Sequence, residues 1–146
     1  MEIAHVIKKL SPDTETKVGA ILLSSDGNLI AGSFNGFCQG APDEDLPCTR
    51  PLKYELIQHA ERNMLYNCNA ESIGTKGSTV ICTLSPCLEC LRACFRSKVK
   101  TIYFDKLYTA FGSVEFYSKL PDISVVISKE GEYTRLDMSR KDGRGV

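Results

Sequence analysis

The chain has 146 residues, in which 18 lysines and arginines balance 18 aspartates and glutamates. This length holds one domain with a hydrophobic core, so we expect a single domain over residues 1–146 and no second catalytic domain. The zero net charge argues against binding to long nucleic acid. Neither a membrane-spanning apolar run nor a signal-peptide pattern is present, which indicates a cytoplasmic protein.

The first third of the chain predicts a helix, a hairpin and a long loop. A short amphipathic helix that ends before Pro12 is indicated by apolar residues at helical spacing, namely Ile3, Val6, Ile7 and Leu10. Residues 17–23 and 29–34 are strand-like, and the Asp-Gly pair at 26–27 is a hairpin turn signal. Residues 35–53 combine prolines, glycines and acidic residues, which favours a long ordered loop of the kind that often carries function.

The remaining two thirds alternate between helical and strand patterns. Helices are expected over 57–68, 87–97 and 110–120, and strands over 78–84, 99–104 and 123–127. This alternation predicts parallel strands joined by right-handed crossovers. The fold class is therefore α/β, a three-layer α/β/α fold whose five-stranded mixed sheet is flanked by helices. A polar surface tail is expected over 137–146.

Seven cysteines and only two histidines narrow the search for chemistry. The odd count, without signs of secretion, favours reduced thiols, some of them binding metal, over a disulfide framework. Three cysteines on apolar faces are expected in the core: Cys68, Cys82 and Cys94. Cys38 and Cys48 share the long loop, where buried thiols are favoured over a second metal site. Any histidine chemistry must use His5 or His59.

Two short segments carry the candidate chemistry, His59-Ala60-Glu61 and Pro86-Cys87-Leu88-Glu89-Cys90. One imidazole and two thiolates give three ligands for a tetrahedral Zn²⁺ and leave a fourth position for water, as in catalytic zinc sites. Cys87 and Cys90 stand at i and i+3 in the first turn of an expected helix, which points both sulfurs to one side and favours thiolates. Glu61 can take a proton from a water whose pKa zinc lowers to about 7.

Each segment alone has a plainer interpretation. A lone Cys-x-x-Cys is often half of a structural zinc knuckle or a redox pair, and a lone His-x-Glu is weaker still. Together, in this order and each opening a helix beside a strand, they favour catalytic zinc. His-x-Glu followed by Pro-Cys-x-x-Cys is the pattern of the zinc nucleobase deaminases.

From residue 17 to about 127 the chain resembles the cytidine and deoxycytidylate deaminase superfamily, and within it the deoxycytidylate (dCMP) deaminases. The segments that carry the resemblance are 17–20 (KVGA), 34–36 (FNG), 50–54 (RPLKY), 59–63 (HAERN) and 83–90 (TLSPCLEC). The resemblance implies a cytidine-deaminase-like fold and zinc-dependent hydrolysis of dCMP to dUMP and ammonia, which supplies dUMP for thymidylate synthesis. It also implies a homo-oligomer, whether dimer, tetramer or hexamer.

The resemblance implies a role for each site residue. His59, Cys87 and Cys90 would bind zinc. Glu61 would protonate N3 of the cytosine as water attacks C4, and would then pass a proton to the leaving amino group. The implied substrate contacts are the backbone N–H groups of Ala60 and Cys87, Asn35 at the sugar hydroxyl, Tyr108 against the pyrimidine, and Lys17, Arg50, Lys53 and Arg62 as cations for the phosphate.

Three departures from the family pattern bear on cofactors and regulation. Cys38 stands where relatives often have proline, and the cysteine–histidine set of a second, structural zinc is incomplete, so one catalytic zinc is expected. The loop that senses deoxynucleoside triphosphates in some relatives is matched only in part. Allosteric control by dCTP or dTTP with Mg²⁺ is therefore a hypothesis.

Several other functions share the metal motif. The substrate could be dCTP or a modified dCMP. The neutral charge and the 35–53 insertion count against a tRNA adenosine deaminase, and His59 counts against a free-nucleoside cytidine deaminase, which usually has cysteine there. Guanine deaminases and the riboflavin-pathway deaminase are less similar elsewhere, and a non-catalytic zinc-stabilised domain would leave Glu61 dispensable. A compact enzyme of this kind fits a bacterium, a phage or a large virus, in which last case it would act in the host cytoplasm.

Overall fold

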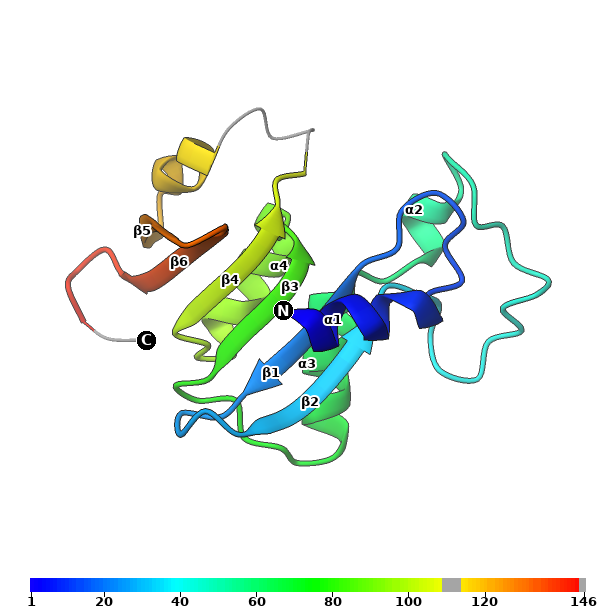
Figure 1. Cartoon of the computed structure of the whole chain (residues 1–146), viewed down its shortest axis with the longest axis horizontal. Coiled ribbons are helices and arrows are strands. Elements are labelled where there is room, and N and C mark those ends of the chain that lie inside the picture. Colours follow the sequence, from blue (N-terminus) through cyan, green and yellow to red (C-terminus); the bar gives the residue numbers. More distant parts are fainter. Residues whose placement is uncertain (109–113, 145–146) are drawn as a thin grey trace.

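The computed structural model describes residues 1–108 and 114–144 (Figure 1). The elements of its first half are α1 (Glu2–Ile7), a 3₁₀ turn η1 (Lys8–Leu10), β1 (Gly19–Leu23), β2 (Leu29–Phe34), α2 (Lys53–Leu56) and α3 (Ala60–Ala70). The second half contains β3 (Thr79–Leu84), α4 (Leu88–Arg96), β4 (Thr101–Lys106), the 3₁₀ helix η3 (Val114–Lys119), β5 (Ile123–Glu130) and β6 (Tyr133–Arg140).

One mixed sheet carries the fold, in the strand order β2-β1-β3-β4-β6-β5. β1 pairs antiparallel with β2 and with β3, and β3 pairs parallel with β4, as the helix–strand alternation predicts. β6 pairs antiparallel with both β4 and β5. β5 therefore runs in the same direction as β4, as expected, but β6 separates the two. The α/β class is confirmed, with six strands in place of the five that we predicted.

The prediction of a polar tail over 137–146 is wrong for its first four residues, because β6 continues to Arg140. Along β6 the side chains alternate between a buried and a more exposed face, and Thr134, Leu136 and Met138 are the buried members. Only two of these three are apolar, and charged residues lie between them, so the strand pattern is weak in the sequence. Tertiary pairing between β4 and β5 supplies the burial that this segment's own composition does not indicate.

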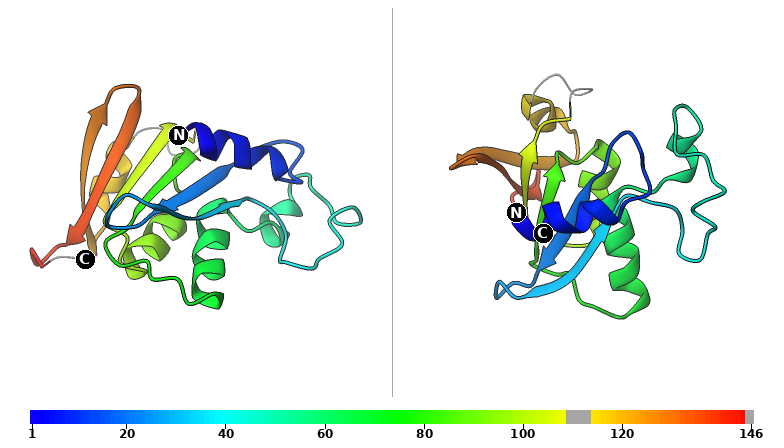
Figure 2. Two further views of the ribbon diagram at one scale, coloured as in Figure 1. Left: turned by 60° about the horizontal axis from the view of Figure 1, so that its bottom comes forward. Right: turned by 45° about the vertical axis from the view of Figure 1, so that its right-hand side comes forward.

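The hydrophobic core lies between the sheet and the helices α3 and α4. Figure 2 shows α3 and α4 on one face of the sheet and α1 on the opposite face. The core includes the largest buried side chains from both layers, among them Leu22, Met64, Leu91, Ile102 and Phe104. Cys68, Cys82 and Cys94 are buried in this core, as predicted.

The helix α1 confirms the first predicted element but turns much of its apolar stripe outward. Ile3, Val6 and Leu10 are 49%, 62% and 67% exposed, whereas Ala4 is buried against the sheet. The close approach of α1 to β1 requires glycine at position 19, where a Cβ would lie 2.1 Å from the backbone oxygen of Ala4. Ile7 is half-buried, with its side chain close to Gly32 of β2, so the outward part of the stripe consists of Ile3, Val6 and Leu10.

The long loop predicted over 35–53 is confirmed between β2 and α2, and it extends away from the sheet (Figure 1). Its thiols are not buried as we expected, because Cys38 is exposed and Cys48 is half-buried. The helix predicted over 110–120 overlaps η3, while residues 109–113 lie outside the described part of the chain. In that part, no helix is long and apolar enough to cross a bilayer.

Candidate metal centre and substrate pocket

Two helix N-termini bring the candidate metal ligands together. His59 is the N-cap residue of α3, and Cys87, which follows β3, is the N-cap residue of α4. Cys90 lies in the first turn of α4, and its backbone N–H donates to the Cys87 sulfur at 3.4 Å. Cys87 follows β3, a central strand of the sheet, and the segment before His59 is held by the bridge between Gly36 and Gln58.

The three ligand atoms are spaced for zinc. Nδ1 of His59 lies 3.4 Å from the sulfur of Cys87 and 3.4 Å from that of Cys90, and all three atoms lie within 4.8 Å of one another. With Zn–S near 2.3 Å and Zn–N near 2.0 Å, a tetrahedral ion separates its nitrogen and sulfur ligands by about 3.5 Å. The donor set and its spacing therefore fit Zn²⁺.

The electrostatics of the cluster favour the thiolate form of Cys87. Hydrogen bonding from Cys90, assisted by His59, lowers the pKa of Cys87 to about 4 against the opposing effect of burial. The hydrogen bond between His59 and Cys87 raises the pKa of His59, because the imidazolium faces the Cys87 thiolate. A thiolate is the form of cysteine that binds metal.

Glu61 lies in the first turn of α3, two residues beyond His59, and is only 3% exposed. Burial is the main cause that raises the pKa of its carboxyl group, because the interior disfavours the charged form. Glu61 lines the same pocket as His59, Ala60 and Cys87. A carboxyl group at this place can exchange protons with a molecule in the pocket.

The pocket has a volume of about 250 Å³. Of the residues implied in substrate binding, the lining includes Asn35, Arg50, Lys53, Ala60 and Tyr108. The side-chain oxygen of Ser85 accepts a hydrogen bond from the Tyr108 backbone N–H at 2.7 Å, which fixes the chain just after β4. With Cys87, which also lines the pocket, six of the eight implied substrate contacts thus surround one cavity.

Lys17 and Arg62 are not among the described residues that line this pocket. The Lys17 ammonium group donates to the backbone oxygens of Lys9 and Ser11, at 3.3 and 2.6 Å. Arg62 forms an ion pair with Glu89 at 3.0 Å. Both side chains are therefore engaged elsewhere in the fold.

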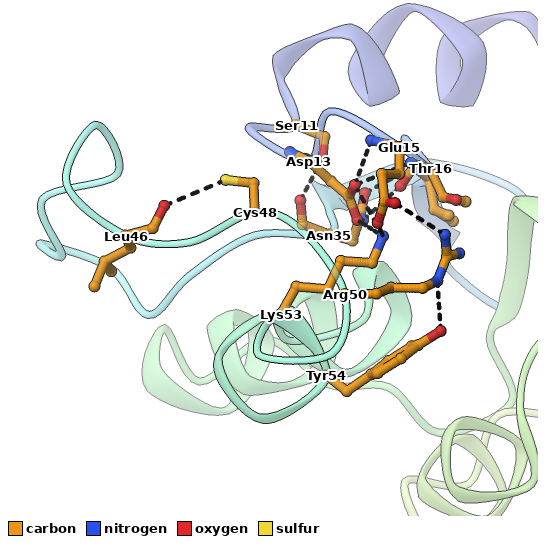
Figure 3. A network of polar contacts seen from close by, with 11 residues as sticks. Ser11, Asp13, Glu15, Thr16, Asn35, Leu46, Cys48, Arg50, Lys53 and Tyr54 are labelled. Carbon is orange, nitrogen blue, oxygen red and sulfur yellow. Dashed lines mark hydrogen bonds and ion pairs between the residues drawn. The ribbon is translucent and has the colours of Figure 1, made fainter.

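A buried polar network forms part of the pocket wall (Figure 3). Asp13 accepts hydrogen bonds from the backbone N–H groups of Glu15 and Thr16, at 2.8 and 2.9 Å. It also accepts from the Asn35 amide at 3.2 Å and from the Lys53 ammonium group at 2.9 and 3.1 Å. Burial acts against the Asp13 charge, but the hydrogen bonds from Thr16 and Lys53 outweigh it and lower the pKa of Asp13.

The side chain of Asn35 makes three hydrogen bonds in and around this network. Its amide group donates to Asp13 and to the backbone oxygen of Thr16, at 3.2 and 2.8 Å, and its oxygen accepts from the Val18 N–H at 2.7 Å. Both amide hydrogens are therefore engaged, and the second lone pair of the oxygen remains for a hydroxyl donor.

Several residues near the site were missed in the sequence analysis. Asp13 and Glu15 precede the first strand in a segment whose only signal is its polarity. The Tyr117 hydroxyl donates to the backbone oxygen of Pro86 at 2.5 Å and so supports the segment that carries Cys87.

Tyr54, which lines the pocket, was also missed, and it accepts a hydrogen bond from Arg50 at 2.5 Å. Its place in the RPLKY segment, directly after Lys53, is the signal that could have found it.

An imidazole and two thiolates at helix N-termini, with a buried glutamate beside them, form the arrangement found in zinc-dependent nucleobase deaminases. The chain belongs to the family described as the cytidine and deoxycytidylate deaminase zinc-binding region, whose model matches residues 1–106. The resemblance seen in the sequence is thereby confirmed.

Relatives and solved structures agree with this assignment. The deoxycytidylate deaminase of Homo sapiens is 29% identical over 110 residues, which cover 71% of this chain and 61% of the human protein. The chain thus spans about three fifths of that relative's length. A dCMP deaminase from cyanophage S-TIM5, solved in complex with dCMP and dUMP, superimposes with a TM-score of 0.66 and 27% identity, covering 80% of this chain and 83% of that chain.

A probable deoxycytidylate deaminase of Caenorhabditis elegans is 29% identical over 139 residues, covering 89% of this chain and 70% of the relative. A tRNA:A34 deaminase structure is 22% identical with a TM-score of 0.56. At that level of identity the tRNA enzyme supports the fold alone.

Proposed function

We propose that this chain is a single zinc-dependent deaminase domain that hydrolyses dCMP to dUMP and ammonia. The observation that carries the proposal is the buried carboxyl group of Glu61, which lines the same pocket as His59 and Cys87. A domain that used zinc only to hold its fold would have no reason to bury an acid beside an open cavity, because burying a carboxyl group is costly.

In the proposed reaction, His59, Cys87 and Cys90 hold zinc, which supplies a water nucleophile with a pKa near 7. Glu61 takes a proton from the attacking water and gives it to N3 of the cytosine as the C4–O bond forms. Glu61 then moves the remaining hydroxyl proton to the amino group, the C4–N bond breaks and ammonia leaves. The backbone N–H groups of Ala60 and Cys87 orient the base and the water.

The sugar and phosphate of dCMP would contact the other pocket residues. The sugar hydroxyl donates to the side-chain oxygen of Asn35, the pyrimidine packs near Tyr108, and Arg50 and Lys53 face the phosphate. Lys17 and Arg62 take no part, because their side chains are engaged outside the pocket lining. Two cations suit a monophosphate better than the triphosphate of dCTP.

The test is the loss of cytosine absorbance during incubation of the zinc-loaded protein with dCMP, dCTP, deoxycytidine and cytosine. We expect dCMP to react fastest, and we expect Glu61→Ala to abolish the reaction while one zinc per chain remains. Comparable turnover of dCTP would overturn the monophosphate preference. Bound zinc without turnover of any of the four would overturn the proposed substrate class.

Oligomeric state, location and regulation remain predictions from the resemblance. We propose a homo-oligomer, and the exposed apolar side chains of α1 (Ile3, Val6 and Leu10) are the surface that a second copy of this chain would cover. Sedimentation of the wild type and of Val6→Asp tests this, since the variant should shift toward monomer. Cytoplasmic location and allosteric control by dCTP or dTTP with Mg²⁺ are proposed on the resemblance alone, and unchanged kinetics with either nucleotide would refute that control.

A further inference from the structure

The charges at the phosphate-facing part of the pocket cancel one another. The Lys53 ammonium group lies 2.9 Å from Asp13 and 3.0 Å from Glu15, and the Arg50 guanidinium group lies 3.3 Å from Glu15 (Figure 3). Two cations therefore face two carboxylates. A phosphate that enters this pocket finds both cations already paired.

The two carboxylates differ in how firmly they are held. Asp13 is 3% exposed and accepts hydrogen bonds from backbone, amide and ammonium donors. If its side chain moved away, several buried donors would lose their acceptor. The Glu15 side chain is 33% exposed, and its contacts in the described part of the chain are to Lys53 and Arg50. Glu15 is thus the carboxylate that can move into solvent at low cost.

The two cations lie on the wall of the pocket, and Glu15, which contacts both, lies outside the described lining. Lys53 and Arg50 line the pocket, whereas Glu15 is not among the described residues that line it. Arg50 is 42% exposed and lies over the Tyr54 ring, with its carbon CZ 5.7 Å from the ring centroid. This stacking holds the guanidinium group near the pocket even without its Glu15 partner.

We propose that Glu15 is a built-in competitor which occupies Lys53 and Arg50 until the phosphate of the substrate displaces it. This inference rests on the proposed function, because it assumes a phosphorylated substrate. When Glu15 swings into water, two cations, Lys53 and Arg50, and one carboxylate, Asp13, remain. Their charges sum to one net positive charge facing the phosphate. Glu15 thereby weakens the binding of every phosphate-bearing ligand and leaves an unphosphorylated nucleoside unaffected.

Removing the Glu15 charge should therefore improve substrate binding. For Glu15→Gln we expect the KM for dCMP to fall about two- to fivefold, the range set by the strength of an exposed ion pair. The KM for deoxycytidine should not change. Inorganic phosphate should inhibit the variant more strongly by a similar factor. The matched control is Glu130→Gln, which removes a surface carboxylate paired with Arg135, and it should change none of these constants.

A purely structural role for Glu15 predicts the opposite. An unchanged or raised KM for dCMP in Glu15→Gln, or an equal change for deoxycytidine, would overturn the proposal. Thermal melting verifies that the variant folds, and Glu15→Ala is a second variant with the same expected direction.

Direct binding separates this inference from the proposed function. Calorimetry with inorganic phosphate and with dUMP measures affinity without turnover. Tighter binding to Glu15→Gln, with no deamination of dCMP by the wild type, would uphold the competitor and refute the proposed reaction. Deamination of dCMP by the wild type, with equal phosphate affinity in the wild type and in Glu15→Gln, would uphold the proposed reaction and refute the competitor.

Discussion

The buried ion pair between Asp13 and Lys53 leads to the most quantitative prediction about stability. The two side chains are 3% and 6% exposed, and their charged groups lie 2.9 Å apart. Asp13→Ala leaves the Lys53 charge buried with only Glu15 to balance it, and it also removes the acceptor for two backbone N–H groups. Breaking a buried pair from one side costs about 3–5 kcal/mol. Because Glu15 still contacts Lys53, we expect the lower end, about 3 kcal/mol.

The assay is urea unfolding at neutral pH with zinc in constant excess, since metal binding shifts apparent stability. A loss of about 3 kcal/mol corresponds to a Tm lower by roughly 6–12 °C for a chain of this size. The double variant Asp13→Leu with Lys53→Met should recover the part of the loss that comes from the unpaired Lys53 charge, but the N–H groups of Glu15 and Thr16 stay without their acceptor. A loss below about 1 kcal/mol for Asp13→Ala would refute the view that this pair is desolvated and tightly held.

Three further predictions concern packing, pH and metal. Gly19→Ala should lower the free energy of unfolding by about 2–3 kcal/mol in urea, because its Cβ would collide with the Ala4 backbone oxygen; a neutral result would mean that α1 does not dock as described. The lowered pKa of Asp13 contributes stability that is fully present above its unfolded pKa of about 4 and is lost as pH falls through the folded value. Urea midpoints between pH 5 and pH 2 should therefore fall more steeply for the wild type than for Asp13→Asn. Cys87→Ser should reduce bound zinc well below one per chain by elemental analysis, and full retention would exclude Cys87 as a ligand.

Much of the fold was predictable because local patterns agree with the tertiary structure there. The turn at 26–27, the strand patterns of β1 to β5 and the proline before Cys87 each carry a local signal. β6 was missed because its burial comes from pairing with β4 and β5 rather than from its own composition. The outward apolar stripe of α1 was also invisible, because the spacing of Ile3, Val6 and Leu10 shows that they share a face and does not show what that face meets.

The metal cluster was predictable for a different reason. Ligand chemistry restricts its residue types, and helix geometry restricts the spacing of Cys87 and Cys90. Cations for a phosphate carry no such restriction, since any lysine or arginine qualifies in a sequence. Only the structure separates Arg50 and Lys53, which line the pocket, from Lys17, which is bonded to backbone oxygens. Partners that come from distant segments, such as Asp13 with Lys53, leave no local pattern.

The most direct test of the central claim is the release of ammonia from dCMP by the wild type and by Glu61→Gln, each with its zinc content measured. Glutamine keeps the shape of the side chain but cannot carry the proton. The account predicts one zinc per chain in both proteins and a rate at least 100-fold lower in the variant. A Glu61→Gln variant that holds zinc and releases ammonia at the wild-type rate would contradict the account.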